Sequence, residues 1–274
     1  MKNFYVIGNN ASRSLSPIIF NYWFKKYKLK ASYGFKELNS KSFNPSIKNI
    51  LKDENTFGLN ITIPFKTKIL KHLDTTDIHA KKINAVNCIV KKTKISGINT
   101  DWLGYFKTLP KTKNINKKRV LLVGYGGAAL AIHYVLKKEG FKDIIIVNRT
   151  KRKIRFQKNN RFTKNINDIH KYLSVSDIII NTIPKNPIHK KNIRLVRKDT
   201  LLSDIVYSPK ETAFLKSFPN NKKIYGISML LQQAIPCFNL WFGFRPKIDS
   251  TLLEILNRKI KWQLSLVLPG GLVL

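Results

Sequence analysis

The chain is poor in cysteine, which limits the kinds of site it can contain. Cys88 and Cys237 are its two cysteines in 274 residues. Cysteines so few and so far apart provide neither a zinc-binding pair nor a disulfide framework, and this usage is typical of a reducing cytoplasm. The five histidines share no ligand spacing either. We therefore expect a cytoplasmic protein with no bound metal and no catalytic histidine.

Acidic residues are also scarce, so the chain is strongly basic. It has 15 aspartates and glutamates against 51 lysines and arginines, a formal net charge of +36. Such an excess suggests a nucleic-acid-binding protein, because basic surfaces release counterions from phosphate backbones. However, the lysines are spread along the whole chain, and no basic block with interleaved aromatic residues stands out. We expect non-specific adhesion to polyanions and no specific nucleic-acid partner.

Long hydrophobic runs are missing as well. No stretch approaches the roughly 20 apolar residues that a membrane span requires, and the apolar start at residues 4–7 is too short for a signal peptide. Hydrophobic residues still make up 43% of the chain, enough for one large or two ordinary domains. The sequence predicts a soluble globular protein with no membrane partner.

The most informative stretch combines two apolar runs with a glycine-rich turn. The valine and leucine run at residues 120–123 is typical of a strand buried on both faces. Gly124, Gly126 and Ala129 follow with the G-x-G-x-x-A spacing of a dinucleotide-binding turn. Helical character and a second apolar run at residues 144–147 complete the unit. We interpret it as a nucleotide-binding motif; a tight turn that binds nothing is the alternative.

The residues after the second run indicate which dinucleotide is bound. An NAD-binding motif carries a carboxylate there for the ribose hydroxyls, whereas this chain has Asn148, Arg149 and Thr150, with Lys153 close behind. A carboxylate would repel a 2′-phosphate, and a guanidinium can bind one through paired hydrogen bonds. The sequence favours NADP. In so basic a chain, Arg149 and Lys153 can also be solvated surface charges.

Two serines precede the first predicted helix. Ser14 and Ser16 lie in a polar loop after a strand, ahead of Pro17, a residue that often opens a helix. Such loops at strand ends bind ligands in α/β proteins. The plainer interpretation is that Ser16 caps the helix and Ser14 is ordinary loop.

Further polar candidates lie at residues 57–101. Asn60 and Thr62 share one face of a predicted strand, and Lys66 begins the segment after the proline that ends it. These residues could line a cleft, or they could form the wet face of an edge strand. Asp101 stands at a strand-to-helix junction, where an N-cap is the commonest role for a carboxylate.

The second half of the chain adds two candidates. Tyr207 ends the strand predicted at residues 201–206, at the sheet edge where ligands of parallel sheets lie. It can equally be a buried ring with a satisfied hydroxyl. Gln233 lies in the apolar helical segment at residues 227–240, facing either a cleft or solvent.

Taken in order, these motifs resemble the shikimate dehydrogenase family, whose members reduce 3-dehydroshikimate with NADPH. The resemblance is collinear and covers nearly the whole chain. It is carried by residues 14–17, 60–66, 85–87, 99–101, 124–128, 148–150, 204–207, 226 and 229–233.

The resemblance implies a substrate site, a cofactor site and a catalytic pair. For the substrate's carboxylate and hydroxyls it implies Ser14, Ser16, Asn60, Thr62, Asn87, Asp101, Tyr207 and Gln233. For NADP it implies Gly124, Tyr125, Gly126, Gly127, Ala128, Asn148, Arg149, Thr150, Lys153, Ile205 and Gly226. The implied catalytic pair is Lys66 and Asp101. An ammonium there can stabilise the charge that hydride transfer builds on a carbonyl oxygen, and a carboxylate can hold it in place.

The implied fold is α/β, with two domains and a cleft between them. An N-terminal α/β domain at residues 1–103, completed by C-terminal helices at residues 238–274, would bind substrate. A doubly wound Rossmann domain at residues 104–237 would bind NADP. The apolar tail at residues 264–274 would pack on the first domain or be an extension without function. The implied function is reversible reduction of 3-dehydroshikimate on the route to chorismate and aromatic amino acids, with homodimer formation left open.

Five positions depart from the family pattern. The residues Asn10, Arg13, Asn84, Cys88 and Trp102 stand where proline, histidine, glycine, threonine and glycine are usual. None of these changes removes a proposed catalytic group, so we expect activity. Trp102 is bulky and adjoins Asp101, and it could shift the local geometry.

Two other functions stay open at this point. A relative that acts on quinate or uses NAD is disfavoured by the paired serines and by Arg149. A degenerate relative that binds polyanions is disfavoured by the intact Lys66, Asp101 and glycine turn.

Overall fold

The computed structural model describes residues 1–156 and 161–260, and the apolar tail at residues 264–274 lies outside them. The chain divides into two compact units. Unit 1 comprises Met1–Asp101 together with the chain from Leu231 onward, and unit 2 is Trp102–Leu230. Each unit contains one six-stranded sheet. We describe the units separately.

Unit 1 is built on a mixed sheet with the strand order β2-β1-β3-β5-β6-β4. Strand β1 is parallel to both β2 and β3, whereas β5 pairs antiparallel with β3 and β6. The strands are β1 (Lys2–Gly8), β2 (Ala31–Glu37), β3 (Thr56–Ile61), β4 (Thr75–Thr76), β5 (Cys88–Lys91) and β6 (Ile95–Ile98).

Strand β3 is an interior strand, so the edge-strand interpretation of its polar residues is wrong. It lies between β1 and β5, and Leu59, Asn60 and Ile61 are all buried. The partners that cover β3 are the first strand of the chain and a strand 30 residues downstream. Its polar residues therefore belong to the interior of the unit.

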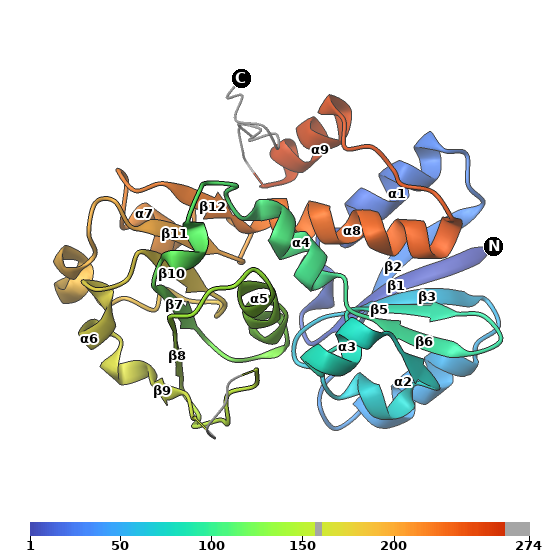
Figure 1. Cartoon of the computed structure of the whole chain (residues 1–274). Helices are drawn as coiled ribbons and strands as arrows, with labels where there is room; N and C mark the ends of the chain where they lie inside the picture. Colours follow the sequence, from blue (N-terminus) through green and yellow to red (C-terminus); the bar gives the residue numbers. More distant parts are fainter. Residues whose placement is uncertain (157–160, 261–274) are drawn as a thin grey trace. The chain divides into compact units, whose positions relative to one another are not determined.

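Helices cover both faces of this sheet (Figure 1). On one face, an aromatic cluster joins β1 and β2 to α1 (Ser16–Lys26) and α8 (Gly226–Phe242); it comprises Phe4, Phe20, Trp23, Phe24, Tyr33, Phe238, Trp241 and Phe242. On the other face, Phe43 and Ile47 of α2 (Phe43–Lys52) pack with Ile7 and Leu59. The unit also contains α3 (Ile78–Ile83) and α9 (Ser250–Ile260).

The ends of α3 explain one departure from the family pattern. Asp77 caps the helix by accepting hydrogen bonds from the backbone N–H groups of His79 and Ala80. Asn84 ends it at φ 62°, in the left-handed region that glycine and asparagine tolerate best. Asparagine can therefore replace the usual glycine at this position.

Unit 2 has the doubly wound arrangement predicted for the glycine-rich stretch. Its sheet has the order β12-β11-β10-β7-β8-β9, and every pair of neighbours is parallel. The order reverses between β10 and β7, where such folds bind ligands. The strands are β7 (Val120–Val123), β8 (Ile144–Asn148), β9 (Lys164–Asn165), β10 (Ile178–Asn181), β11 (Leu201–Asp204) and β12 (Lys223–Tyr225). The helices are α4 (Asp101–Thr108), α5 (Gly127–Lys138), α6 (His170–Leu173) and α7 (Ala213–Lys216).

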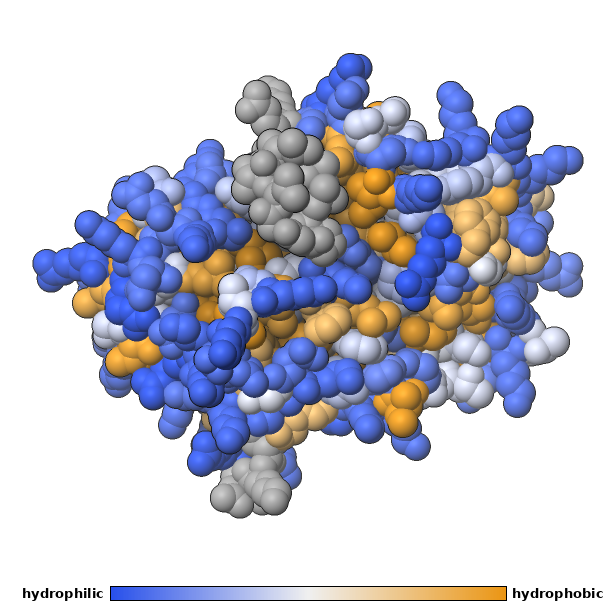
Figure 2. Space-filling view, turned by 45° about the horizontal axis from the view of Figure 1, so that its top comes forward, coloured by the Kyte–Doolittle hydropathy of each residue, from blue (hydrophilic) through white to orange (hydrophobic). Residues whose placement is uncertain are grey.

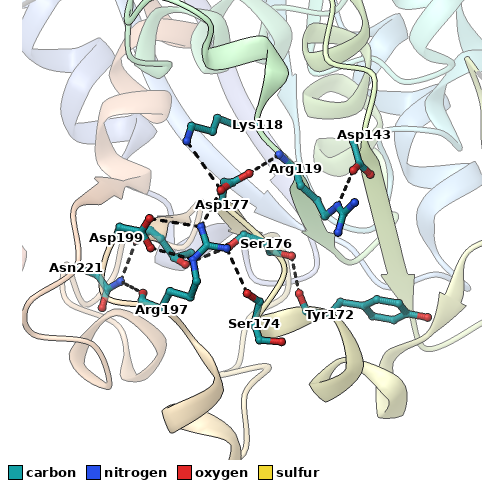
Figure 3. Close-up of polar contacts among 11 residues, drawn as sticks. Lys118, Arg119, Asp143, Tyr172, Ser174, Ser176, Asp177, Arg197, Asp199 and Asn221 are labelled. Carbon is teal, nitrogen blue, oxygen red and sulfur yellow. Dashed lines mark hydrogen bonds and ion pairs between the residues drawn. The ribbon is translucent and has the colours of Figure 1, made fainter.

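Polar contacts gather at the amino ends of these strands (Figure 3). The Asp177 carboxylate, just before β10, accepts hydrogen bonds from the Arg119 backbone N–H at 2.8 Å and from the Arg197 guanidinium at 2.7 Å. Arg197 also donates to Asp199 at 3.0 Å, and Asn221 donates to the Arg197 carbonyl at 2.8 Å. These bonds join the segments that precede β7, β10, β11 and β12. The predicted ligand-binding loops lie at the opposite, carboxyl ends of the strands.

The surface is largely hydrophilic. Hydrophilic residues cover most of the face shown in Figure 2, with hydrophobic residues between them. Within the described part of the chain, no helix combines the length and the apolar character needed to cross a bilayer.

Candidate active site

The centre of the candidate site is an ion pair between Lys66 and Asp101. The Lys66 ammonium lies 2.5 Å from an Asp101 carboxylate oxygen, and the two side chains are only 12% and 5% exposed. Lys66 is held in place because its carbonyl accepts a hydrogen bond from the Val86 N–H at 2.8 Å. Asp101 is the first residue of α4. Its side chain contacts Lys66 and Asn87. Asp101 therefore lies at the start of a helix and also contacts other residues of the site.

Asn87 connects this pair to the start of α4 and to α8. Its side-chain amide nitrogen lies 3.0 Å from Asp101 Oδ1, 2.9 Å from Thr100 Oγ1 and 3.0 Å from Gln233 Oε1. Its side-chain oxygen accepts from the Thr100 N–H at 2.6 Å. An amide nitrogen has two hydrogens for these three acceptors. Gln233 Oε1 has further donors, because the Thr100 hydroxyl lies 3.4 Å from it and Cys237 Sγ lies 3.7 Å from it. Asn87, Thr100, Asp101 and Gln233 therefore form one connected hydrogen-bond network.

Asn60 is hydrogen-bonded to Asn87 and to other residues around it. Its side chain is 6% exposed and donates to the Asn87 carbonyl at 2.9 Å and to Cys237 Sγ at 3.2 Å. It also accepts from the Tyr33 hydroxyl at 2.6 Å. Both amide hydrogens are thus used within unit 1. The contacts of Asn60 are those of a residue that fixes Asn87.

The serine loop and Thr62 lie at the carboxyl ends of the neighbouring strands β1 and β3. Ser14 accepts a hydrogen bond from the Ser16 N–H at 3.2 Å, whereas Ser16 is the first residue of α1 and Leu15 occupies the N-cap position. The expectation that Ser16 caps the helix is therefore wrong, because Ser14 supplies the hydroxyl at the helix start. Gly8 allows the close approach of Thr62, since a Cβ on Gly8 would lie 2.3 Å from the Thr62 methyl group.

The loop ahead of Ser14 is anchored by an acidic residue that sequence reasoning did not single out. Glu37, at the end of β2, accepts from the backbone N–H of Ser12 at 3.0 Å and from its hydroxyl at 2.5 Å. These two bonds hold the pKa of Glu37 below its ordinary value. The loop therefore keeps a fixed path from β1 to α1.

Tyr207 belongs to unit 2, whereas the other substrate candidates belong to unit 1. It is half-buried and follows Asp204, which is fully buried and bonded to Thr212, Val206 and Asn181. Burial raises the pKa of Asp204 despite these bonds. Gly226 lets the start of α8 approach this segment, because a Cβ on it would lie 2.4 Å from the Ile205 carbonyl oxygen.

The glycine-rich turn leaves room for a ligand at the start of α5. Gly124 has φ +92°, and a Cβ on it would lie 2.4 Å from Thr182 Oγ1, so both its conformation and its surroundings require glycine. Gly126 has an ordinary φ of −90°, and a Cβ there would meet no atom within 4 Å. The protein itself gives no reason for glycine at Gly126. Close approach of a pyrophosphate to the helix N-terminus does give one.

The predicted 2′-phosphate residues follow β8. Asn148 accepts a hydrogen bond from the Tyr125 N–H at 3.1 Å and donates to the Thr150 carbonyl at 2.7 Å, which links this segment to the turn. Arg149 and Lys153 are exposed. The remaining predicted cofactor residues Gly127 and Ala128 begin α5. These residues suit NADP.

Trp102 leaves the catalytic candidates intact. Its ring packs edge-on against Tyr134 of α5, with centroids 5.9 Å apart, while the Lys66–Asp101 pair remains formed. Across residues 1–156 and 161–260, no three histidine, cysteine or acidic side chains are grouped as metal ligands.

The sequence is similar to those of known proteins along most of its length. Residues 6–89 match the model of the shikimate dehydrogenase substrate binding domain, and residues 108–210 match the model of shikimate / quinate 5-dehydrogenase. A shikimate dehydrogenase (NADP(+)) of Pelagibacter ubique is 36% identical to this chain, across 93% of this chain and 99% of the relative.

Solved structures show the same fold. The shikimate dehydrogenase of Aquifex aeolicus superimposes with a TM-score of 0.79 at 30% identity, covering 94% of this chain and 98% of that protein. A shikimate 5-dehydrogenase of Listeria monocytogenes in complex with shikimate and NAD gives a TM-score of 0.73 at 26% identity, covering 93% and 96%.

Proposed function

Because this chain belongs to the shikimate dehydrogenase family, we propose that it catalyses the reversible reduction of 3-dehydroshikimate to shikimate with NADPH. The buried ion pair between Lys66 and Asp101 is the observation that supports this proposal most directly. The product would feed chorismate and aromatic amino acid synthesis in the cytoplasm.

The proposed chemistry uses Lys66 as the proton donor. When bound, NADPH would supply a hydride to the carbonyl carbon, and negative charge would build on the carbonyl oxygen. The Lys66 ammonium stabilises that charge and donates a proton to the oxygen, giving the hydroxyl of shikimate. Asp101 keeps the ammonium oriented, because it holds Lys66 at 2.5 Å while Asn87 holds the other carboxylate oxygen at 3.0 Å.

The remaining polar residues of unit 1 would hold the substrate. Ser14 and Ser16 stand at the start of α1, where hydroxyls and backbone N–H groups suit a carboxylate. Asn87 and Gln233, whose side chains are bonded to each other at 3.0 Å, would bind ring hydroxyls, since side-chain amides both donate and accept. Thr62 from the end of β3 and Tyr207 of unit 2 would complete the substrate contacts.

Unit 2 would bind NADP. The pyrophosphate would lie over Gly126 at the start of α5, where a Cβ would meet no protein atom. The 2′-phosphate would be bound by Arg149 together with Asn148, Thr150 and Lys153. This loop contains no carboxylate, which would repel the phosphate. Ile205 and Gly226, at the carboxyl-end loops of the sheet, would adjoin the nicotinamide half.

The function is tested by following the near-ultraviolet absorbance of reduced nicotinamide with purified protein. Shikimate and quinate are each offered with NADP and with NAD. We expect the fastest turnover with shikimate and NADP. Faster turnover with quinate or with NAD would contradict the proposed substrate or cofactor, and a folded protein that turns over none of the four pairs would contradict the proposed activity.

The role of Lys66 is tested by Lys66→Ala. Loss of the proton donor should lower turnover by about a hundredfold to ten-thousandfold, while NADPH binding is unchanged because Lys66 belongs to unit 1. Lys68→Ala is the matched control, since Lys68 is an exposed lysine bonded to Ser40. Equal turnover in the two variants would remove Lys66 from the mechanism.

A further inference from the structure

A buried histidine lies behind the glycine-rich turn. His133, on α5, is fully buried, and burial lowers its pKa to about 3. Its Nδ1 lies 3.0 Å from the Tyr125 hydroxyl oxygen. Its Nε2 has no hydrogen-bond partner among the described residues. A buried polar atom without a hydrogen bond costs free energy, so the one polar contact that His133 does make calls for an explanation.

The Tyr125 hydroxyl has a second hydrogen-bond partner. The backbone N–H of Arg155 donates to the Tyr125 hydroxyl oxygen at 2.9 Å. The hydroxyl is the donor to His133 Nδ1 when the neutral imidazole carries its hydrogen on Nε2, and the acceptor when Nδ1 carries it. In both tautomers the hydroxyl is held between His133 and Arg155.

Tyr125 contacts the segment after β8 at three points. We call residues 148–155 the basic segment. The hydroxyl of Tyr125 accepts from Arg155 N–H, its carbonyl accepts from the Arg152 guanidinium at 3.3 Å, and its N–H donates to Asn148 at 3.1 Å. One residue of the turn is thus bonded to the beginning, the middle and the end of the basic segment.

The charge of the basic segment explains why such an anchor is needed. Residues 149–155 include two lysines and three arginines and no acid. Like charges this close repel one another. The described backbone of the segment also pairs with residues 161–163 and, through Asn148, with Asn165 of β9. Among the three contacts with Tyr125, the bond from the Arg155 N–H is the one that needs the tyrosine side chain, because the other two use the Tyr125 backbone.

We propose that Tyr125 is a positioning residue for NADP, which fixes the basic segment so that Arg149 and Lys153 meet the 2′-phosphate while the turn holds the pyrophosphate. The inference rests on the proposed NADP binding. His133 supports this role indirectly, because its hydrogen bond with the Tyr125 hydroxyl holds that hydroxyl in place. Discrimination between NADP and NAD would then depend on a buried hydroxyl as well as on exposed cations.

Tyr125→Phe tests the proposal because it removes the hydroxyl and keeps the ring. Binding of 2′,5′-ADP and of 5′-ADP, which lacks the 2′-phosphate, is measured by calorimetry. Loss of one anchoring hydrogen bond should weaken 2′,5′-ADP binding about fivefold and leave 5′-ADP binding unchanged. Tyr105→Phe is the matched control, since it removes another buried hydroxyl of unit 2, bonded to Ser203, and should leave both affinities unchanged.

A second variant keeps the test decisive if Tyr125→Phe folds poorly. His133→Leu keeps the Tyr125 hydroxyl but removes its imidazole partner, and should also weaken 2′,5′-ADP binding selectively. Unchanged 2′,5′-ADP binding in the folded variants, or equal weakening of both ligands, would overturn the positioning role. Equal affinity of the wild-type protein for the two ligands would instead contradict the proposed preference for NADP.

Discussion

Replacing His133 by leucine should make unit 2 less sensitive to acid. Burial lowers the pKa of His133 from 6.5 to about 3, so the folded protein keeps the ring neutral at pH values where the unfolded chain protonates it. Between these two values the unfolded state binds more protons, and the free energy of unfolding falls as the pH falls. A pH of about 5 is roughly 1.5 units below the ordinary pKa of histidine. The free energy of unfolding should therefore be about 2 kcal/mol lower at about pH 5 than at about pH 7.5.

The measurement is hydrogen exchange of the α5 amides, which reports the free energy of opening of this part of unit 2. Opening free energies at about pH 5 and about pH 7.5 are compared in wild type, in His133→Leu and in the exposed-site control His170→Leu. The pH-dependent loss should shrink by about 2 kcal/mol in His133→Leu alone. All other titrating groups are the same in wild type and in His133→Leu, so their contributions cancel when the pH-dependent losses of the two proteins are subtracted. An equal loss in all three proteins would show that the ring is protonated in the folded state, and the reasoning would fail.

Two further predictions concern unit 2. Gly126→Ala should leave thermal stability unchanged, because its Cβ meets no protein atom, yet weaken NADPH binding at least about tenfold by calorimetry; full binding would show that no phosphate lies against Gly126. Although burial opposes it, the bonds from Arg119 N–H and Arg197 hold the pKa of Asp177 below its ordinary 3.8, so Asp177 stabilises the fold above that pH and less as the pH falls below it. Asp177→Asn should lower the free energy of urea unfolding by about 2 kcal/mol at neutral pH and by less in acid, and a loss that is constant with pH would refute the charge-based explanation.

The parts of the fold that follow from local sequence were predicted well. The strand, turn, helix and strand around Gly124 and Gly126 occur as β7, α5 and β8, because each is specified by residues within a few positions of one another. The pairing of Lys66 with Asp101 was proposed from the family motif, and the ion pair in the structure agrees with it. Composition alone could not have selected Lys66 among so many lysines.

The parts that depend on distant residues could not be predicted. Tyr33 and Cys237 contact Asn60 across 27 and 177 residues of sequence, and no periodicity in the sequence connects them. The position of β3 in the sheet interior depends in the same way on β5. His133 gave no signal beyond a polar residue on an apolar helix face, since its partners in the turn and the basic segment were not known to meet there.

The discontinuity of unit 1 has a consequence for biosynthesis. Strand β1 packs against α8, where Phe4 and Trp241 lie 4.7 Å apart and the Trp241 indole donates to the Ile89 carbonyl at 2.9 Å. A ribosome makes β1 and α1 first, and it makes the part of α8 that belongs to unit 1 only after the whole of unit 2. The aromatic face of the first sheet is therefore covered by α1 alone until α8 is complete, whereas unit 2 is continuous in sequence. A released chain of residues 1–230 should be cut by protease more readily within residues 1–101 than within unit 2.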